Sequence, residues 1–103
     1  MGYKLIISVE AKNHLDNIIS YIIFRLKNPE AALLILDSVN KAYSDIETFP
    51  EAWALCNDSF LSDKGYRKYV LPNHNYVILY RVSGEFIKIS GIFHVREDYS
   101  KKL

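Results

Sequence analysis

The stretch LDNIISYIIFRLKNPEAALLILDSVNKAYSDIETFP, residues 15–50, decides the fold that the sequence predicts. Its first part repeats apolar residues at the three- and four-residue spacing of an amphipathic helix, which we expect over residues 11–27. Asn28-Pro29-Glu30 then combines a helix N-cap, a proline suited to a first helical turn and an acidic residue suited to the helix dipole. These residues therefore end the first helix and begin a second, which we expect to run to about Thr48. So short a connection predicts an antiparallel helical hairpin.

The apolar stripes of the two helices define the expected core. They comprise Leu15, Ile18, Ile19, Ile22, Ile23 and Leu26 on the first helix, and Ala32, Leu36, Val39, Tyr43 and Ile46 on the second. Each stripe needs a partner layer, and a sheet is the available one.

Strand patterns flank the hairpin on both sides. Residues 3–9 predict a short strand, with Ser8 as the N-cap of the helix that follows. Residues 51–64 have no clear period and are expected to form a loop anchored by Trp53 and Phe60. Alternating patterns then predict strands over 65–71, 75–82 and 85–93, joined by a turn at 72–74 and a tight turn at Ser83-Gly84. The order β-α-α-β-β-β predicts a single α+β domain over residues 1–103, an antiparallel meander sheet packed on the helical hairpin.

Composition excludes several classes of protein. Half of the 103 residues are apolar and 24% are charged, which is typical of an ordered globular domain. A lone cysteine, Cys56, cannot form an internal disulfide, and no Cys/His spacing indicates a zinc site. No apolar run is long enough for a membrane span or a signal peptide. We therefore expect a cytoplasmic protein with no metal and no cofactor.

Charge is divided unevenly along the chain. Residues 1–63 contain five Lys or Arg and nine Asp or Glu, whereas residues 64–103 contain eight and three, although the net charge is only +1. The excess of positive charge in the second part indicates an anionic partner, or else an attraction between the two parts of the chain.

Strand alternation assigns side chains to the two faces of the sheet. We expect Ile87, Ile89 and Phe93 to face the helices, and Val77, Leu79 and Arg81 to lie on the open face. The polar side chains expected on or beside the open face are Arg67, Tyr69, Arg81, Lys88, His94 and Arg96. Arginine can clamp phosphate, tyrosine can stack on a base and histidine can move protons, which are the roles needed to cleave RNA by in-line attack of a 2′-hydroxyl. The ordinary alternative is a solvated sheet face with a half-buried histidine at a strand end and Arg96 paired with Glu97 or Asp98.

Six short strings, in this order along the chain, resemble the RelE/ParE superfamily of bacterial toxins from type II toxin–antitoxin modules. They are SVEAKNHLDNIISYI (residues 8–22), NPEAA (28–32), FP (49–50), GYRKY (65–69), YVILYRV (76–82) and FHVRED (93–98). The resemblance implies a compact toxin that inhibits growth, stabilises plasmids and is neutralised by a cognate acidic antitoxin in a hetero-oligomer.

The resemblance leaves the target open, because RelE-like members cut mRNA in the ribosomal A site whereas ParE-like members poison DNA gyrase without enzymatic activity. We expect the first, a metal-independent, ribosome-dependent endoribonuclease, and keep the second as the alternative; an inactive member that only binds a partner is a third hypothesis. Carried over by position, the candidate catalytic residues are His94, Arg96, Arg81 and Arg67, and the candidate RNA-binding residues are Lys68, Tyr69, Lys88 and Tyr99. Val77 stands where many RNA-cutting members carry an arginine, and the isoelectric point of 7.8 is low for a ribosome-binding protein.

Overall fold

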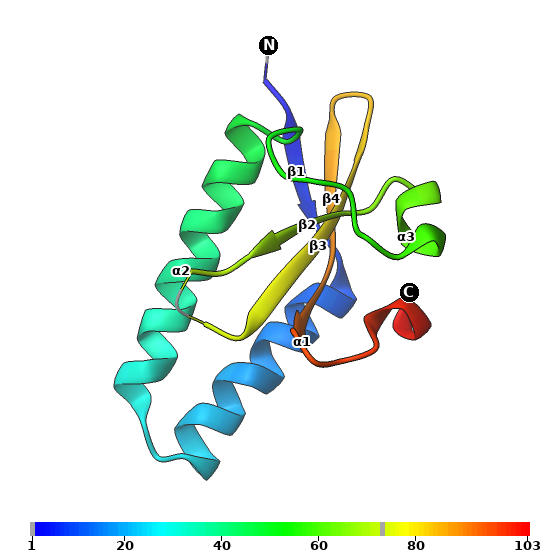
Figure 1. Cartoon of the computed structure of the whole chain (residues 1–103). Coiled ribbons are helices and arrows are strands. Elements are labelled where there is room, and N and C mark those ends of the chain that lie inside the picture. The colour runs from blue at the N-terminus through cyan, green and yellow to red at the C-terminus, as the bar shows by residue number, and fades with distance from the viewer. Residues whose placement is uncertain (1, 73) are drawn as a thin grey trace.

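A helical hairpin and a four-stranded sheet form the two layers of the protein (Figure 1). The computed structural model describes residues 2–72 and 74–103. Its elements are β1 (Lys4–Ile7), α1 (Val9–Ser20), a π-helical turn (Tyr21–Arg25), α2 (Pro29–Thr48), α3 (Ser59–Asp63), β2 (Arg67–Val70), β3 (Tyr76–Ser83), β4 (Phe86–His94) and a 3-10 turn (Tyr99–Lys102). The sheet has the order β1-β4-β3-β2, with β2, β3 and β4 antiparallel and β1 parallel to β4. The predicted α+β fold and the meander are confirmed.

Side-chain caps set the start of each helix of the hairpin. The Ser8 hydroxyl accepts a hydrogen bond from Ala11 N at 3.0 Å, so α1 begins at Val9, two residues earlier than predicted. The Asn28 side chain accepts from Ala31 N at 3.1 Å, and α2 has the predicted bounds. No helix in the described part of the chain is long and apolar enough to cross a membrane.

The first helix ends differently from the prediction. The chain widens into the π-helical turn, in which Leu26 N donates to Tyr21 O at 3.2 Å, five residues back. Lys27 then takes the left-handed conformation that commonly follows a helix end, with φ 51°. As a result Leu26, expected in the apolar stripe, is 57% exposed.

The main core lies between the helices and one side of the sheet, which we call the helix side. The buried stripe of α2 is Ala32, Ile35, Val39, Ala42 and Ile46. The predicted positions Leu36 and Tyr43 are only half-buried, because the helix is rotated so that Ile35 and Ala42 take the buried positions instead. The helices α1 and α2 run in opposite directions along this side (Figure 1).

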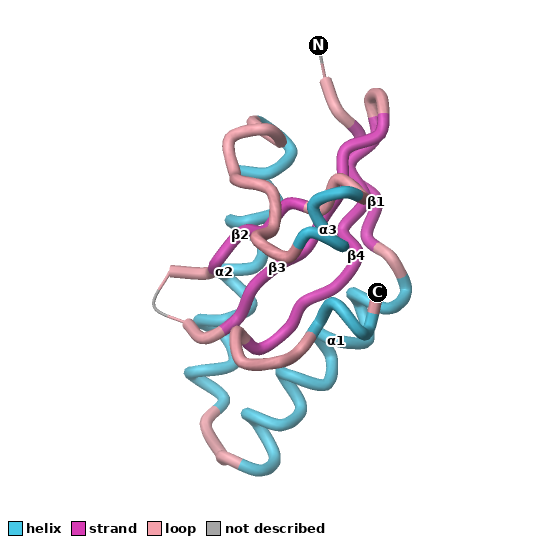
Figure 2. Tube along the Cα trace, turned by 45° about the vertical axis from the view of Figure 1, so that its right-hand side comes forward, coloured by secondary structure: helices cyan, strands magenta, loops and turns pink. Residues whose placement is uncertain are grey.

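A second, smaller core covers part of the opposite side of the sheet, which we call the outer side. The region expected to be a loop contains the short helix α3, and Leu61 is its fully buried anchor, whereas Phe60 is half-exposed. The second core consists of Cys56, Leu61, Tyr66, Val77, Leu79 and Phe93, with Tyr99 and Leu103 packed against it. The side predicted to be open is therefore partly covered by α3 and the C-terminal turn (Figure 2).

A β-bulge in β4 reverses the predicted alternation. Leu79 pairs with Gly91 but Tyr80 pairs with Ile89, so Ser90 has no opposite residue on β3. Ile87 and Ile89 lie on the helix side as predicted, yet Phe93 belongs to the second core on the outer side. The predicted row of Ile87, Ile89 and Phe93 is thus wrong beyond the bulge.

The same bulge moves His94 to the helix side. His94 pairs with Tyr76, whose ring packs on the main core and meets the imidazole edge-on at 5.6 Å between centroids. The prediction that His94 shares the open face with Lys88 is therefore wrong.

The register of β2 also differs from the prediction. Arg67 pairs with Tyr80 and Tyr69 with Ile78, so both lie on the helix side, whereas Lys68 pairs with Leu79 and lies on the outer side. The prediction that Arg67 and Tyr69 lie on the open face is wrong, because a strand of four residues is too short for its alternation to decide the register.

A tight turn joins β3 to β4. Gly84 and Glu85 form the two-residue turn between β3 and β4, one position later than predicted. Gly84 has φ +60°, a conformation in which glycine avoids the strain of a side chain. The turn predicted at 72–74 includes Asn73, which lies outside the described residues.

Candidate functional site

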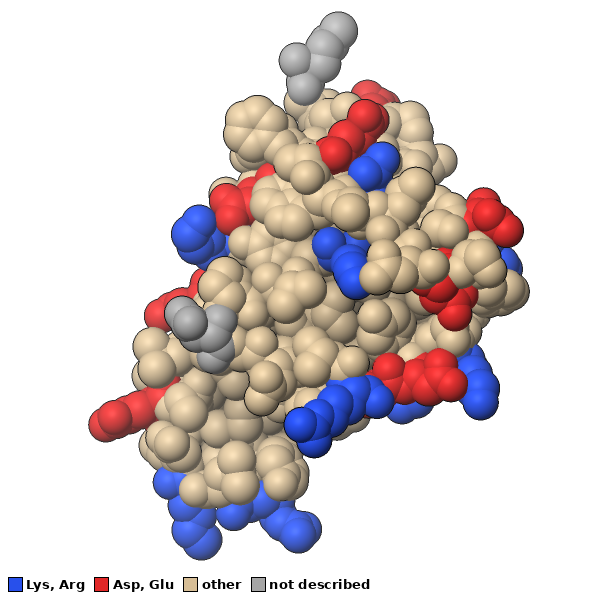
Figure 3. Space-filling model, in the orientation of Figure 1, with Lys and Arg blue, Asp and Glu red and all other residues tan. Residues whose placement is uncertain are grey.

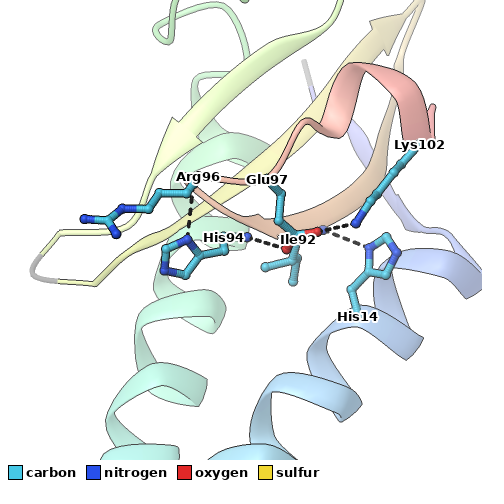
Figure 4. A network of polar contacts seen from close by, with 6 residues as sticks. All are labelled: His14, Ile92, His94, Arg96, Glu97 and Lys102. Carbon is cyan, nitrogen blue, oxygen red and sulfur yellow. Dashed lines mark hydrogen bonds and ion pairs between the residues drawn. The ribbon is translucent and has the colours of Figure 1, made fainter.

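Polar side chains gather where β4 ends and the C-terminal segment begins (Figure 4). His94 N donates to Glu97 Oε1 at 2.9 Å, and Lys102 Nζ donates to Glu97 Oε2 at 2.6 Å. Burial of the carboxyl opposes its ionisation, but the hydrogen bonds from Lys102 and the His94 N–H outweigh it and hold the pKa of Glu97 below its ordinary value. An ionised Glu97 therefore fastens the C-terminal turn to the end of the sheet.

The ring of His94 is oriented by the next turn of the backbone. Arg96 N donates to His94 Nδ1 at 3.1 Å, so the neutral imidazole carries its proton on Nε2. The Arg96 guanidinium is exposed and points away from Glu97 and Lys102 (Figure 4). His94 and Arg96 can both donate hydrogen bonds to an anion, but Nδ1 is occupied and Nε2 is a donor, so this ring has no free lone pair to act as a base.

His14, which the sequence did not single out, closes the edge of β4. Strand β1 pairs with β4 only as far as Ile89, and Ser8 N donates to Ile89 O at 3.0 Å. Beyond that point Ile92 N donates to His14 Nδ1 at 3.2 Å, which satisfies an edge group that β1 does not reach. The signal in the sequence was the position of His14 three residues after Ala11, on the same face of α1.

Arg67 and Tyr69 have structural contacts on the helix side. Arg67 Nη1 donates to the Trp53 carbonyl at 2.7 Å, which holds the segment after α2 against the sheet. Tyr69 is 6% exposed, its ring lies 4.7 Å from that of Trp53, and its hydroxyl donates to Asp45 Oδ2 at 2.9 Å. That hydrogen bond, with one from Lys41, lowers the pKa of Asp45. Tyr69 cannot stack on a base in this position.

Cations line the outer side of the sheet. Arg81 and Lys88 are directly opposite each other on β3 and β4, and the Arg81 guanidinium lies 4.8 Å from the centre of the Tyr66 ring. Lys64, Arg81 and Lys88 line one hollow of about 320 Å³. Lys68 lies on the same side, nearer the second core. Of these residues the sequence singled out Arg81, Lys88 and Lys68 but missed Lys64 and Tyr66, although Tyr66 alternates with Lys68 along the strand.

Tyr99 packs on the second core. Its ring stacks on that of Phe93, with centroids 5.6 Å apart and an interplanar angle of 26°, and burial raises the pKa of its hydroxyl. Within residues 2–72 and 74–103, no three His, Cys, Asp or Glu side chains come together as a metal site requires.

The structure does not bring the four candidate catalytic residues together. Arg67 and His94 lie on the helix side of the sheet, Arg81 lies on the outer side, and Arg96 follows the end of β4. The candidate RNA-binding residues are divided in the same way, with Lys68 and Lys88 on the outer side, Tyr69 in the main core and Tyr99 against the second core.

Comparisons with known proteins agree with this fold. A family model described as the ParE toxin of the type II toxin–antitoxin system parDE matches residues 5–99. A solved structure of the chromosomal ParDE toxin–antitoxin system from P. aeruginosa superposes with a TM-score of 0.74 at 22% sequence identity, covering 89% of this chain and 95% of that chain. No curated protein gave a significant sequence match. Because the family model spans nearly the whole chain, the protein belongs to the ParE family of toxins from type II toxin–antitoxin systems.

Proposed function

We propose that the protein inhibits bacterial growth by binding DNA gyrase and poisoning it, without cleaving RNA. The observation that supports this proposal is the separation of the candidate catalytic residues. RNA cleavage by in-line attack needs an acid or base and a charge clamp around one phosphate. Arg67 and Arg81 lie on opposite sides of the sheet, and His94 has its Nδ1 occupied by Arg96 N. A gyrase poison needs a binding surface and no proton transfer, and membership of the ParE family favours it further.

We also infer a cognate antitoxin as partner, as the family implies. Apolar side chains stand exposed on the helical hairpin, where a protein partner could bury them: Tyr21, Phe24, Leu26, Leu33 and Leu34 are 51–71% exposed. Figure 3 shows cations at the end of the molecule where α1 and α2 are joined. The excess of positive charge in residues 64–103 also favours an acidic, amphipathic antitoxin segment over the basic side of the sheet. Binding that disappears in moderate salt would indicate charge contacts alone and count against an antitoxin held by apolar anchors.

The experiment that separates the two targets is induction of the protein in bacteria. The 5′ ends of mRNA are mapped in the same cultures in which a reporter of the SOS response is read. We expect SOS induction with intact mRNA, which indicates damage from trapped gyrase. New in-frame cuts in mRNA without SOS induction would instead support ribosome-dependent cleavage and refute the gyrase proposal.

Two variants sharpen this experiment. His94→Gln removes proton transfer but leaves a polar side chain at the end of β4, and Arg96→Ala removes the exposed guanidinium. Loss of a catalytic acid or base typically slows a reaction about 10²–10⁴-fold, and loss of a charge-stabilising donor about 10²–10³-fold. We expect His94→Gln to remain fully toxic. A His94→Gln protein that folds, binds the antitoxin and is harmless would restore the nuclease hypothesis.

A further inference from the structure

The outer side of the sheet holds a row of cations without acidic partners. Arg81 and Lys88 face each other across the β3–β4 ladder, an arrangement that is destabilising for like charges. Among the described residues, the ion pairs join Lys41 to Asp45, Lys101 to Asp98 and Lys102 to Glu97, so Lys64, Arg81 and Lys88 have no carboxylate within 4.0 Å. The repulsion between Arg81 and Lys88 is offset when an anion binds between the two side chains.

Aromatic rings support two of these cations. Arg81 lies over Tyr66 at 4.8 Å, and Lys64 lies over Phe60 at 4.6 Å. Each interaction restricts a long side chain before any ligand arrives, which lowers the entropic cost of binding. The hollow of about 320 Å³ that Lys64, Arg81 and Lys88 share is lined by no acidic residue.

Lys88 also belongs to a second hollow, of about 280 Å³, beside the bulge and the first turn of α1. Its lining includes Ser8, Ser90 and Lys102, with Glu10 as the acidic side chain. Ser90 is 7% exposed, and its hydroxyl has no hydrogen-bond partner within the part of the chain that the structure describes. The cationic hollow thus adjoins a second hollow at Lys88. In the second hollow the unpartnered Ser90 hydroxyl and the N-terminus of α1 favour an anion, whereas Glu10 opposes it and Lys102 is paired with Glu97.

We propose that this outer face, defined by Lys64, Arg81 and Lys88 with the adjoining Ser90 hollow, binds the phosphodiester backbone of duplex DNA. The choice of duplex DNA rests on the proposed function, because a gyrase poison acts on an enzyme that holds DNA. A nucleic acid presents a regular row of phosphates, which the unpaired cations of this face can neutralise. A protein partner would cover apolar side chains, and the largest group of those lies on the helical hairpin instead.

The test measures binding of a short fluorescein-labelled DNA duplex to the purified full chain by fluorescence anisotropy, at salt concentrations from about 50 to 200 mM. The variant Lys64→Gln/Arg81→Gln/Lys88→Gln removes the three cations of the outer face. The matched control, Lys12→Gln/Arg25→Gln/Lys41→Gln, removes three exposed cations from α1, the π-helical turn and α2. Thermal unfolding of both variants verifies that each is folded.

We expect the wild type and the control to bind the duplex with nearly the same dependence on salt. The outer-face variant should bind more weakly. A plot of the logarithm of its observed binding constant against the logarithm of the salt concentration should also be less steep. The slope should be smaller in magnitude by about 0.9 for each phosphate that the variant no longer neutralises. Unlabelled duplex should compete better than single-stranded RNA of the same length and better than polyglutamate of the same total charge.

Several results would overturn the proposal. They are a wild type that does not bind the duplex, an outer-face variant that binds as the control does, tighter binding of RNA than of duplex DNA, and competition by polyglutamate equal to that of DNA. The assay contains no gyrase, so its failure is separate from failure of the gyrase proposal. A protein that binds DNA through this face yet induces no SOS response would refute the proposed target and leave the binding face intact.

Discussion

Replacing His14 by phenylalanine tests the hydrogen bond that closes the edge of β4. Phenylalanine keeps an aromatic ring beside Phe93, whose centroid lies 4.7 Å from that of His14, but it has no acceptor for Ile92 N. Ile92 is 3% exposed, so its amide would lose its protein acceptor in a largely buried position. An unsatisfied buried donor costs about 1–3 kcal/mol. A destabilisation of about 2 kcal/mol would lower Tm by about 8–16 °C in a domain of this size.

The His14→Asn variant is the matched control, because its Oδ1 occupies nearly the position of the histidine Nδ1 and can accept the same hydrogen bond. It gives up the ring packing and some helix propensity instead. Urea unfolding compares the three proteins, and hydrogen exchange at the Ile92 amide reports the hydrogen bond itself. Exchange of that amide should accelerate about tenfold for each 1.4 kcal/mol of destabilisation in the phenylalanine variant. A phenylalanine variant as stable as the wild type, or an Ile92 amide equally protected in both, would refute the assigned role of His14.

Three further changes have definite expected outcomes. Gly91→Ala should destabilise the fold by about 1–3 kcal/mol, because the new Cβ would lie 2.5 Å from the Phe93 ring in the second core. Urea unfolding measures this, and an unchanged midpoint would show that the Phe93 ring moves freely. Lys88→Glu should stabilise the free protein by up to about 1 kcal/mol at low salt, since it replaces a like charge opposite Arg81, and a lower Tm would contradict this. The lowered pKa of Glu97 means that its stabilisation is complete above its ordinary value of 4.5 and disappears as pH falls through the lowered value. Lys102→Met should therefore reduce the difference in unfolding free energy between about pH 7 and about pH 3, and an equal difference in both proteins would count against the ion pair.

Local signals in the sequence predicted the helical hairpin because they act within a few residues. The Asn28 cap and Pro29 fix the start of α2 through a hydrogen bond that spans only three residues. Ser8 does the same for α1, although the predicted start was two residues late because the apolar repeat begins well after the cap. The buried stripe of α2 was less predictable, since Ala42 is fully buried while the larger Leu36 is not, and residue size and hydrophobicity alone do not indicate this.

Contacts between segments far apart in the sequence determine how much of the outer side of the sheet is covered, and local patterns did not predict this. The second core depends on residues 51–64, where no period exists, and Leu61 is buried because α3 crosses the outer side of the sheet. The hydrogen bond from the Tyr80 hydroxyl to the Pro50 carbonyl, 2.6 Å long, joins two segments that lie far apart in the sequence. Neither interaction has a local signature, so the extent of the covered outer side could not be predicted from alternation.

A single inserted residue, Ser90, determines which chemistry the end of β4 can support. Without the bulge, His94 would lie on the outer side in the same row as Lys88, and an imidazole beside cations would suit phosphate cleavage. With the bulge, His94 turns to the helix side while Arg81 and Lys88 remain opposite each other on the outer side. Arg81 and Lys88 are thereby separated from His94, which keeps only Arg96 as a neighbouring cation. This separation agrees with the proposal that the protein acts by binding its target rather than by cleaving RNA.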